Sequence, residues 1–313
     1  MRPVIVFLRK PPKFPFVRVH RLGFLISLAL MIASAGLLAT RGLNFGIDFK
    51  GGIVMEVKTA TARADLDAMR SQLNGLGLGE VQLQSFGAPN DVLIRLPRQP
   101  GGDQAQNRAA ALVHITLGPS YDYRRTDVVG PKVGNELIRA GTIATVLATL
   151  AIAGYVWFRF EWQFGLGAVF SLFHDVFTAL GLFSALQLEF NLATLAAILT
   201  IAGYSINDKV VIFDRVRENL RKYKQLPLPD LIDLSLNETL ARTLMTSTVT
   251  ALAVLALLLF GGSVIRGFSA AMLWGIGAGT YSSMFLAAPL LLYVKPRRSG
   301  QKAEQITGDP RRA

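Results

Sequence analysis

The hydrophobic pattern of the chain is dominated by six long apolar stretches. A helix needs roughly 20 predominantly apolar residues to cross a bilayer. The fourth stretch continues past Asp208 and Lys209 into the apolar run Val-Val-Ile-Phe. The pattern predicts a polytopic α-helical membrane protein with six transmembrane helices. The six stretches are 22–40, 140–158, 162–188, 190–207, 243–265 and 267–294.

The first stretch resembles a signal peptide in position but not in length. It is too long for an ordinary apolar signal core, and no clear small-residue cleavage site follows it. We therefore expect an uncleaved membrane anchor.

Lysine and arginine are distributed unevenly around the stretches. They gather in the N-terminal segment, between the fourth and fifth stretches, and in the C-terminal tail. With six spans these segments all fall on one side, which the positive-inside rule makes the cytoplasm. We therefore expect a cytoplasmic tail over 1–21, a transmembrane helix over 22–40, an extracytoplasmic domain over 41–138, five more helices within 139–294, and a cytoplasmic tail over 295–313.

Composition agrees with a membrane protein and excludes other classes. Only 17% of residues are charged and 51% are hydrophobic, whereas soluble proteins carry about 25% charged residues. The net charge is +12, but segment 42–137 has as many acidic as basic residues. The basic excess therefore reflects membrane topology rather than nucleic-acid binding. The chain has no cysteine, which excludes disulfides and thiolate metal sites.

The extracytoplasmic segment predicts a small α+β domain between the first two membrane helices. Alternation of apolar and polar residues, helical spacing and turn residues divide it into β-α-β-β-α-β, the ferredoxin-like arrangement. The expected elements are strand 52–58, helix 62–74, strands 80–86 and 92–96 in a hairpin, helix 103–117 and strand 121–129.

This domain offers no evident reaction chemistry. His114 in the second helix has no visible partners, so we expect a packed or surface histidine rather than a metal ligand. No nucleophile, base and acid stand together. A binding or docking module fits better than an enzyme, and no cofactor or metal is expected.

Ionisable residues inside the apolar stretches are the candidate functional groups, because each costs about 3 kcal/mol at a helix centre. Asp208 lies within the fourth stretch, where a carboxyl out of water holds or releases its proton according to how near a cation lies. Arg242, directly before the fifth stretch, is the natural cation. The alternatives are that Asp208 and Lys209 merely end the helix, with Lys209 reaching the headgroups, and that Arg242 is a topology anchor.

His174 and Asp175 lie in the middle of the third stretch. A buried Asp175 needs a partner, from a neighbouring helix or from a hydroxyl such as that of Ser171 or Thr178. The pair is consistent with a proton relay and equally with a structural link between helices.

Small residues indicate where membrane helices approach closely. Gly203 and Ser205 lie beside Asp208, and Gly275 and Gly279 have the spacing of a small-xxx-small motif in the last stretch. We expect helix packing at these positions.

Four segments resemble the SecD/SecF family of the RND superfamily of membrane proteins. Asn-Phe-Gly-Ile-Asp-Phe-Lys-Gly-Gly at 44–52 includes Asp48, Gly51 and Gly52, and Val-Gly-Pro-Lys-Val-Gly-Asn-Glu-Leu at 129–137 includes Gly130 and Pro131. The run 202–219 closes the fourth stretch and includes Asn207, while Ala-Arg-Thr-Leu-Met-Thr-Ser at 241–247 opens the fifth. The resemblance covers nearly the whole chain except the tails.

The resemblance implies an RND-like half-bundle and a role in protein export in the bacterial inner membrane. Size favours the SecF type, because the outer region of SecD is much larger. Family members of this type pair with SecD, associate with the SecYEG channel and YajC, and act on unfolded exported chains. The resemblance makes Asp208 the proton carrier and Arg242 its counter-charge in a process driven by the proton motive force. Two alternatives stay open: a passive scaffold subunit, and a stand-alone RND-like transporter of small molecules or lipids.

Overall fold

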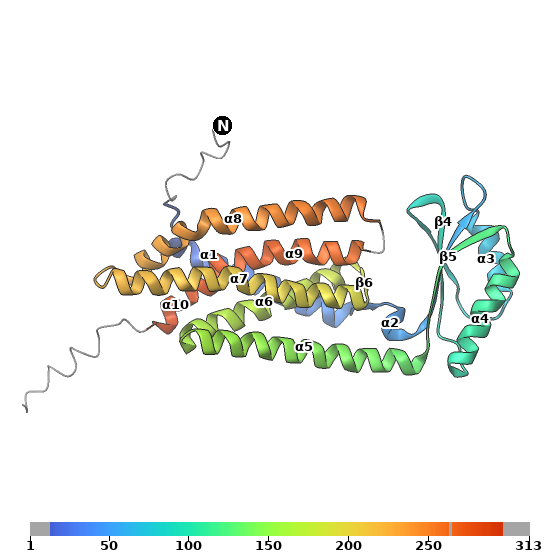
Figure 1. The fold of residues 1–313 in the computed structure, drawn as a ribbon, viewed down its shortest axis with the longest axis horizontal. Helices are drawn as coiled ribbons and strands as arrows, with labels where there is room; N and C mark the ends of the chain where they lie inside the picture. The colour runs from blue at the N-terminus through green and yellow to red at the C-terminus, as the bar shows by residue number, and fades with distance from the viewer. Residues whose placement is uncertain (1–12, 263–264, 297–313) are drawn as a thin grey trace, which may run out of the picture.

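The computed structural model describes residues 13–262 and 265–296. It consists of a helical bundle with an α+β domain at one end (Figure 1). Three segments lie outside the described residues. They are 1–12 and 297–313 in the two expected tails, and 263–264 in the fifth apolar stretch. Within the described ranges, six helices are long and apolar enough to cross a membrane, which confirms the six spans.

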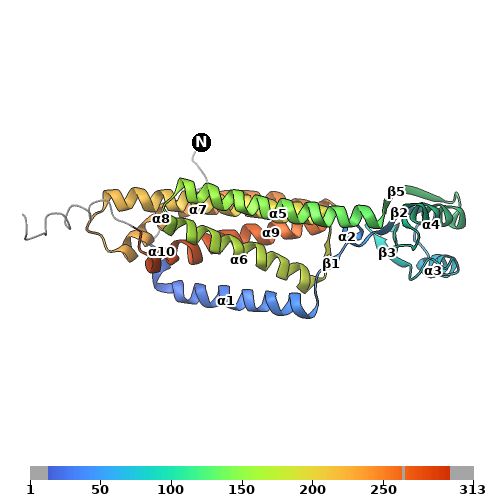
Figure 2. The same cartoon turned by 90° about the horizontal axis from the view of Figure 1, so that it is seen from below.

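The bundle is built from these six helices. They are α1 (Phe16–Thr40), α5 (Pro131–Arg159), α6 (Trp162–Leu186), α7 (Leu192–Lys222), α8 (Leu228–Phe260), and a last span formed by α9 (Arg266–Ser282), the π-helical turn η1 (Ser283–Ala287) and α10 (Ala288–Val294). Figures 1 and 2 show that α1 begins and α10 ends at the end of the bundle opposite the α+β domain.

The structure explains where two helices begin: capping hydrogen bonds fix the start of α7, and core packing fixes the start of α8. Asn191 begins α7 with a reciprocal capping box, in which Asn191 and Thr194 each satisfy the other's backbone amide. Helix α8 begins at Leu228, well before the expected start at 243, because Leu231, Ile232 and Leu236 are buried in the bundle core. Its first turns are therefore held by packing rather than by lipid.

The last span is not a continuous α-helix. Pro289 lacks an amide hydrogen and its ring crowds the carbonyl one turn earlier, which disfavours regular α-helical bonding there. The π turn η1 directly precedes α10, in which Pro289 occupies the first turn. Such turns redirect the side chains that follow or precede them.

The α+β domain, which we call the outer domain, contains β2 (Gly52–Thr59), α3 (Leu66–Asn74), β3 (Gln82–Phe86), β4 (Ala88–Leu96), α4 (Gly102–Leu117) and β5 (Tyr121–Val129). The sheet is antiparallel with strand order β3-β4-β2-β5, which confirms the ferredoxin-like topology. Helices α3 and α4 lie together on one side of the sheet (Figure 2).

The period-two pattern of β2 explains how this sheet is buried. Ile53, Met55 and Val57 are at most 1% exposed and pack with α3 and α4, for example against Met69 and Val113. The intervening side chains point to the face that is turned toward the bundle.

The two largest differences from the expected bounds of this domain lie at the starts of α3 and β4. Helix α3 begins at Leu66 rather than 62, because the Asp65 carboxylate caps it by accepting from Ala68 N at 3.0 Å. Strand β4 begins at Ala88, so the hairpin turns at Gly87 (φ +79°) and includes Pro89 and Asn90 in the strand.

A short connector joins the outer domain to the bundle. It contains β1 (Asn44–Phe45) and α2 (Ile47–Lys50), and β1 pairs in parallel with β6 (Glu189–Phe190), which lies directly before α7. Gly46 N also donates to Phe190 O at 2.9 Å.

Candidate functional site

A fully buried ion pair lies in the interior of the bundle. Lys209 Nζ on α7 is 2.9 Å from Asp175 Oδ2 on α6, and neither side chain has any exposed surface. Taking two charges out of water is costly, so such a pair persists only when further polar groups satisfy the remaining lone pairs and hydrogens.

Those further polar groups come from three helices. Ser282 Oγ on α9 donates to Asp175 Oδ2 at 2.8 Å, and Ser205 Oγ on α7 donates to the same oxygen. His174 Nδ1 lies 3.0 Å from Asp175 Oδ1, and Lys209 Nζ donates to the hydroxyl and carbonyl of Ser205. The cluster therefore links α6, α7 and α9 through one carboxylate.

The structure corrects two expectations about this cluster. Lys209 does not reach the headgroups, because its ammonium is held by Asp175 inside the bundle. The partner of the Asp175 carboxylate comes from a neighbouring helix, which was one of the two expected sources. The hydroxyls named as the other source are wrong: Ser171 donates to the Gly167 and Ala168 carbonyls, and Thr178 donates to the Asp175 carbonyl.

Sequence reasoning placed Lys209 at the headgroups, although a signal for its burial was present. Ser205 and Lys209 are four residues apart, so they occupy one face of α7. The apolar residues that follow Lys209 continue the helix to Lys222, which places Lys209 in the middle of the helix rather than at its end.

Asp208 occupies a separate position on α7. Asp208 is 4% exposed and lies close to Ser247 of α8, and the charges of Lys209 and Arg242 act on its carboxyl. In the described part of the chain no ion pair includes Asp208. Ser247 in turn shares a 2.7 Å hydrogen bond with Thr280 of α9.

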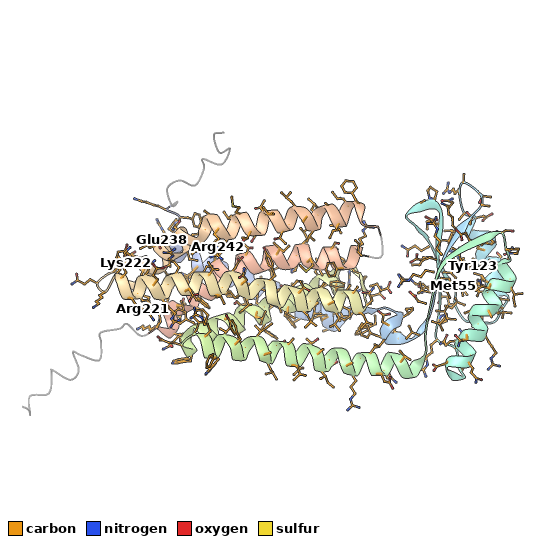
Figure 3. All side chains as sticks on the ribbon, in the orientation of Figure 1. Met55, Tyr123, Arg221, Lys222, Glu238 and Arg242 are labelled. Carbon is orange, nitrogen blue, oxygen red and sulfur yellow. The ribbon has the colours of Figure 1, made fainter. Side chains whose placement is uncertain are left out.

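Arg242 is exposed on α8. Figure 3 labels it beside Glu238, one turn earlier on the same helix, in the half of the bundle away from the outer domain. Glu238 is already engaged, because it accepts from Asn219 at 2.8 Å and lies 3.7 Å from Arg215. Arg242 therefore brings its charge near Asp208 without direct contact.

The glycines differ in what surrounds them. A Cβ on Gly275 would lie 2.3 Å from the buried Ile201, and one on Gly279 would lie 3.0 Å from Ser205 Oγ, so α7 and α9 touch at both glycines. Gly203 is exposed with nothing within 4 Å of its Cβ position, so the expected packing role of Gly203 is wrong. Asn207 is also exposed on α7.

The connector tightens the contact between the outer domain and α7. The Asp48 carboxylate accepts from Leu192 N, the first residue of α7, at 2.8 Å. Gly51 (φ +73°) and Gly52 (φ +140°) take backbone conformations that favour glycine, and a Cβ on Gly52 would lie 2.7 Å from Leu96 O. A Cβ on Gly130 would overlap Asp103, and Pro131 is the first residue of α5.

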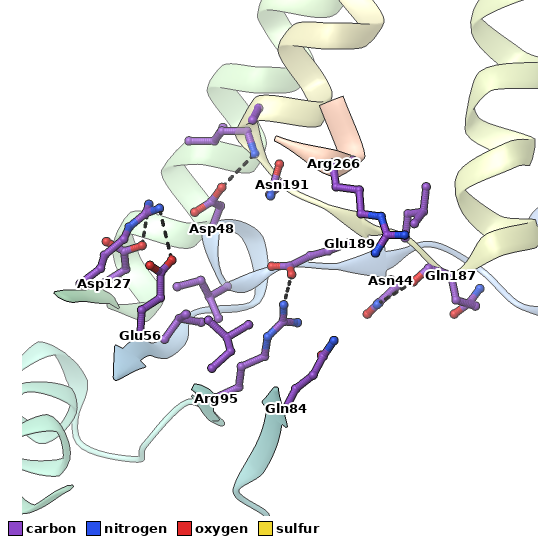
Figure 4. Close-up of a pocket in the computed structure, with 18 residues that line it drawn as sticks. Asn44, Asp48, Glu56, Gln84, Arg95, Asp127, Gln187, Glu189, Asn191 and Arg266 are labelled. Atoms are coloured by element: carbon purple, nitrogen blue, oxygen red, sulfur yellow. Dashed lines mark hydrogen bonds and ion pairs between the residues drawn. The ribbon is translucent and has the colours of Figure 1, made fainter. Parts of the chain in front are cut away.

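A polar cavity of about 610 Å³ lies between the outer sheet and the bundle (Figure 4). An ion pair between Arg95 of β4 and Glu189 of β6 crosses it. Arg125 lies 2.7 Å from Asp127 and 3.9 Å from Glu56, and its hydrogen bond to Asp127 raises the pKa of Arg125. The outer domain is thus attached to the bundle by charges as well as by the chain itself.

His114 is packed, as expected. Its ring centroid lies 3.7 Å from that of Tyr123, whose hydroxyl donates to the His114 carbonyl at 3.3 Å. Across 13–262 and 265–296, no three histidine, cysteine, aspartate or glutamate side chains gather as metal ligands.

These features define a class: a polytopic helical membrane protein with charged groups inside its bundle and one ferredoxin-like outer domain. The chain belongs to the SecD/SecF family. The family model "Protein export membrane protein SecD/SecF, C-terminal" matches residues 110–297, and the "SecD/SecF GG Motif" matches residues 36–62.

Similar proteins agree over nearly the full chain. The "Protein translocase subunit SecF" of Rickettsia felis is 47% identical over 295 residues, covering 92% of this chain and 94% of the relative. The same protein of Rickettsia bellii is 48% identical over 282 residues, covering 89% and 92%.

Two solved SecDF structures share the architecture of this chain. SecDF of Thermus thermophilus, described as a translocon-associated membrane protein, is 35% identical with a TM-score of 0.79 over 91% of this chain. SecDF in a "Super-membrane-facing form" is 36% identical with a TM-score of 0.67 over 94%. This chain spans 39% and 40% of those two chains.

Proposed function

We propose that this chain is a SecF-type subunit of a protein translocase, which works with a SecD-type partner to promote protein export. Family membership and coverage of 94% of a relative named as such a subunit support this role. The 39% share of the SecDF chain supports a partner that supplies the remainder.

The observation that carries the proposal is the environment of Asp208. A carboxyl that is 4% exposed, lies close to Ser247 and has no ion-pair partner in the described chain is suited to exchange a proton. Arg242 is its counter-charge. When Asp208 is protonated, its attraction to Arg242 is lost, and α7 and α8 are free to repack.

The energy available is of the right size. One charge crossing the membrane potential yields about 2.3 kcal/mol per 100 mV. The cost of a charged side chain at the centre of a helix in the membrane is about 3 kcal/mol on insertion scales. The energy that one proton delivers is therefore comparable to the cost of keeping Asp208 ionised in the membrane.

Movement of α7 reaches the outer domain through the connector. Asp48 holds the first turn of α7, β1 pairs with β6 directly before that helix, and Arg95 binds Glu189. A shift of α7 along its axis would act on both the backbone pairing and the ion pair, and so would tilt the sheet.

The buried cluster of Asp175, His174 and Lys209 has two possible roles. It serves as a second part of the proton pathway, or it holds α6, α7 and α9 together while Asp208 changes charge. Because Asp175 already has four polar partners, the structural role is favoured by its geometry.

We place the chain in the bacterial inner membrane, with both tails in the cytoplasm and the domain at 41–138 outside. The expected partners are SecD, the SecYEG channel, YajC, membrane lipids and unfolded exported chains. Neither an enzymatic activity nor a cofactor is part of the proposal.

The test compares Asp208→Asn with Asp214→Asn. Asp214 lies on the same helix but is 44% exposed and pairs with Arg159 at 3.1 Å, so it serves as the control. We expect Asp208→Asn to abolish proton-dependent export while the complex still assembles, and Asp214→Asn to export normally. Full export by assembled Asp208→Asn would leave only the scaffold role. Failure of the wild-type chain to co-purify with a SecD-type protein or the channel would favour a stand-alone transporter.

A further inference from the structure

His174 has a buried nitrogen that the cluster does not use. Its side chain has no exposed surface, and Nδ1 faces Asp175 Oδ1. A carboxylate only accepts hydrogen bonds, so Nδ1 carries the hydrogen and Nε2 of the neutral ring is an acceptor. Among the described residues Nε2 has no hydrogen-bond partner.

A cavity of about 270 Å³ begins at this histidine. We call it the α1–α9 cavity. It lies between those two helices beside α6, and Figure 2 shows α1 along the flank of the bundle next to α6. The lining includes Ile26, Leu30, His174, Trp274, Gly277 and Tyr281. Ile26 and Gly277 are exposed, so the cavity opens sideways at the depth of the membrane spans.

The other polar groups at the cavity are already used. The Tyr281 hydroxyl donates to Gly23 O at 2.6 Å and lies 3.2 Å from Ser27 Oγ. The Trp274 indole donates to Thr178 Oγ1 at 3.4 Å. The cavity therefore has apolar and aromatic walls, and among its described lining side chains His174 Nε2 is the polar atom left without a hydrogen-bond partner.

This chemistry selects among possible occupants. A water molecule needs two to four polar partners to be held in a buried site, and the cavity provides one. A lipid acyl chain matches the apolar walls but leaves the Nε2 acceptor without a hydrogen bond. A buried acceptor without a hydrogen bond costs free energy. A hydroxyl group on an apolar body satisfies both the walls and the acceptor.

We propose that the α1–α9 cavity binds a membrane-dissolved alcohol or phenol, whose hydroxyl donates to His174 Nε2. The site is distinct from Asp208 and does not depend on the export function. Its ligand enters from the membrane between α1 and α9 and contacts the buried cluster only through the histidine ring.

The test uses three probes of nearly equal shape: para-propylphenol, which donates, para-propylanisole, which only accepts, and propylbenzene, which does neither. Trp274 reports on the site directly once the other two of the three tryptophans, Trp157 and Trp162, are replaced by phenylalanine. Binding to the full chain in detergent micelles is then followed by Trp274 fluorescence.

We expect saturable binding of the phenol and about tenfold weaker binding of the other two probes, the effect of one hydrogen bond of about 1.4 kcal/mol. Gly277→Leu fills the cavity from a position with nothing within 4 Å of its Cβ and should abolish phenol binding. Gly203→Leu, at an equally open glycine on α7, is the matched control and should bind normally. His174→Phe should remove the preference for the phenol.

Two results would overturn the proposal. Equal binding of propylbenzene and the phenol would show an apolar groove for acyl chains. Unchanged phenol binding by Gly277→Leu, or a loss by Gly203→Leu of the same size, would show that the probe responds to the micelle rather than to this cavity.

Discussion

Asp208 and Lys209 are neighbours in α7, yet they belong to two different charge sites. Lys209 is held by Asp175 of α6, whereas Asp208 lies close to Ser247 of α8. Successive residues of a helix point about 100° apart, so one helix presents a fixed ion pair to one neighbour and an unpaired carboxyl to another. This division separates the group suited to exchange a proton from the group that holds the bundle.

Single and double substitutions of the Asp175–Lys209 pair should have very different effects on the free energy of unfolding. Lys209→Met leaves a buried carboxylate without its cation, which costs about 3–5 kcal/mol. Asp175→Asn combined with Lys209→Met removes both charges and should recover most of that loss. Thermal unfolding of the purified variants measures both effects.

The control for this cycle is the exposed pair of Arg70 and Asp67. Arg70→Met should change stability by no more than about 0.5 kcal/mol, because exposed pairs contribute little. A single Lys209→Met that unfolds at the wild-type temperature would contradict the importance of the buried pair.

Arg242→Gln should impair export without lowering stability. Arg242 is exposed, so its removal leaves no buried charge behind, but Asp208 loses its counter-charge. We expect proton-dependent export to fall about tenfold, the effect of about 1.4 kcal/mol. Arg221→Gln, an exposed cation near the end of α7, should export normally. Equal losses in both variants would mean that Arg242 acts only through the positive charge of that membrane face.

Two glycines should give opposite results when changed to alanine. Gly275→Ala places a methyl group 2.3 Å from the buried Ile201 and should destabilise the bundle by about 1–3 kcal/mol. Gly203→Ala meets nothing and should stabilise α7 by about 1 kcal/mol, the difference in helix propensity. The unfolding temperatures of the two variants show whether each substitution stabilises or destabilises the protein. Shifts in the same direction for both variants would contradict the packing described for α7 and α9.

The ion pair between Arg95 and Glu189 should restrict the orientation of the outer domain. Because the chain has no cysteine, spin labels can be attached through Gln84→Cys and Ala193→Cys. They would report the distance across the polar cavity between the outer sheet and the bundle. Arg95→Gln should broaden this distance distribution.

The charge-exchanged variant Arg95→Glu with Glu189→Arg should narrow the distribution again. Arg63→Gln, an exposed arginine elsewhere in the outer domain, should leave it unchanged. A distribution insensitive to Arg95 would mean that the chain and the β1–β6 pairing alone hold the domain.

Periodic patterns determined the architecture. Six apolar stretches of sufficient length leave few alternatives to six membrane helices, because an unpaired backbone is not tolerated in lipid. Alternation in β2 and helical spacing in α3 and α4 likewise predicted the ferredoxin-like domain, since each pattern allows one face to be buried. These are properties of short segments, so sequence alone was sufficient.

The partners of the buried charges were decided only by the tertiary structure. The sequence marked Asp175, His174 and Asp208 as costly in a membrane, but it could not show that Lys209 and Ser282, 34 and 107 residues away from Asp175, supply its hydrogen bonds. It also suggested packing at Gly203, where the fold exposes the helix, and concealed the cavity at His174. Which face of a helix meets which neighbour depends on the rotation and crossing of all six helices together, and no local pattern contains that information.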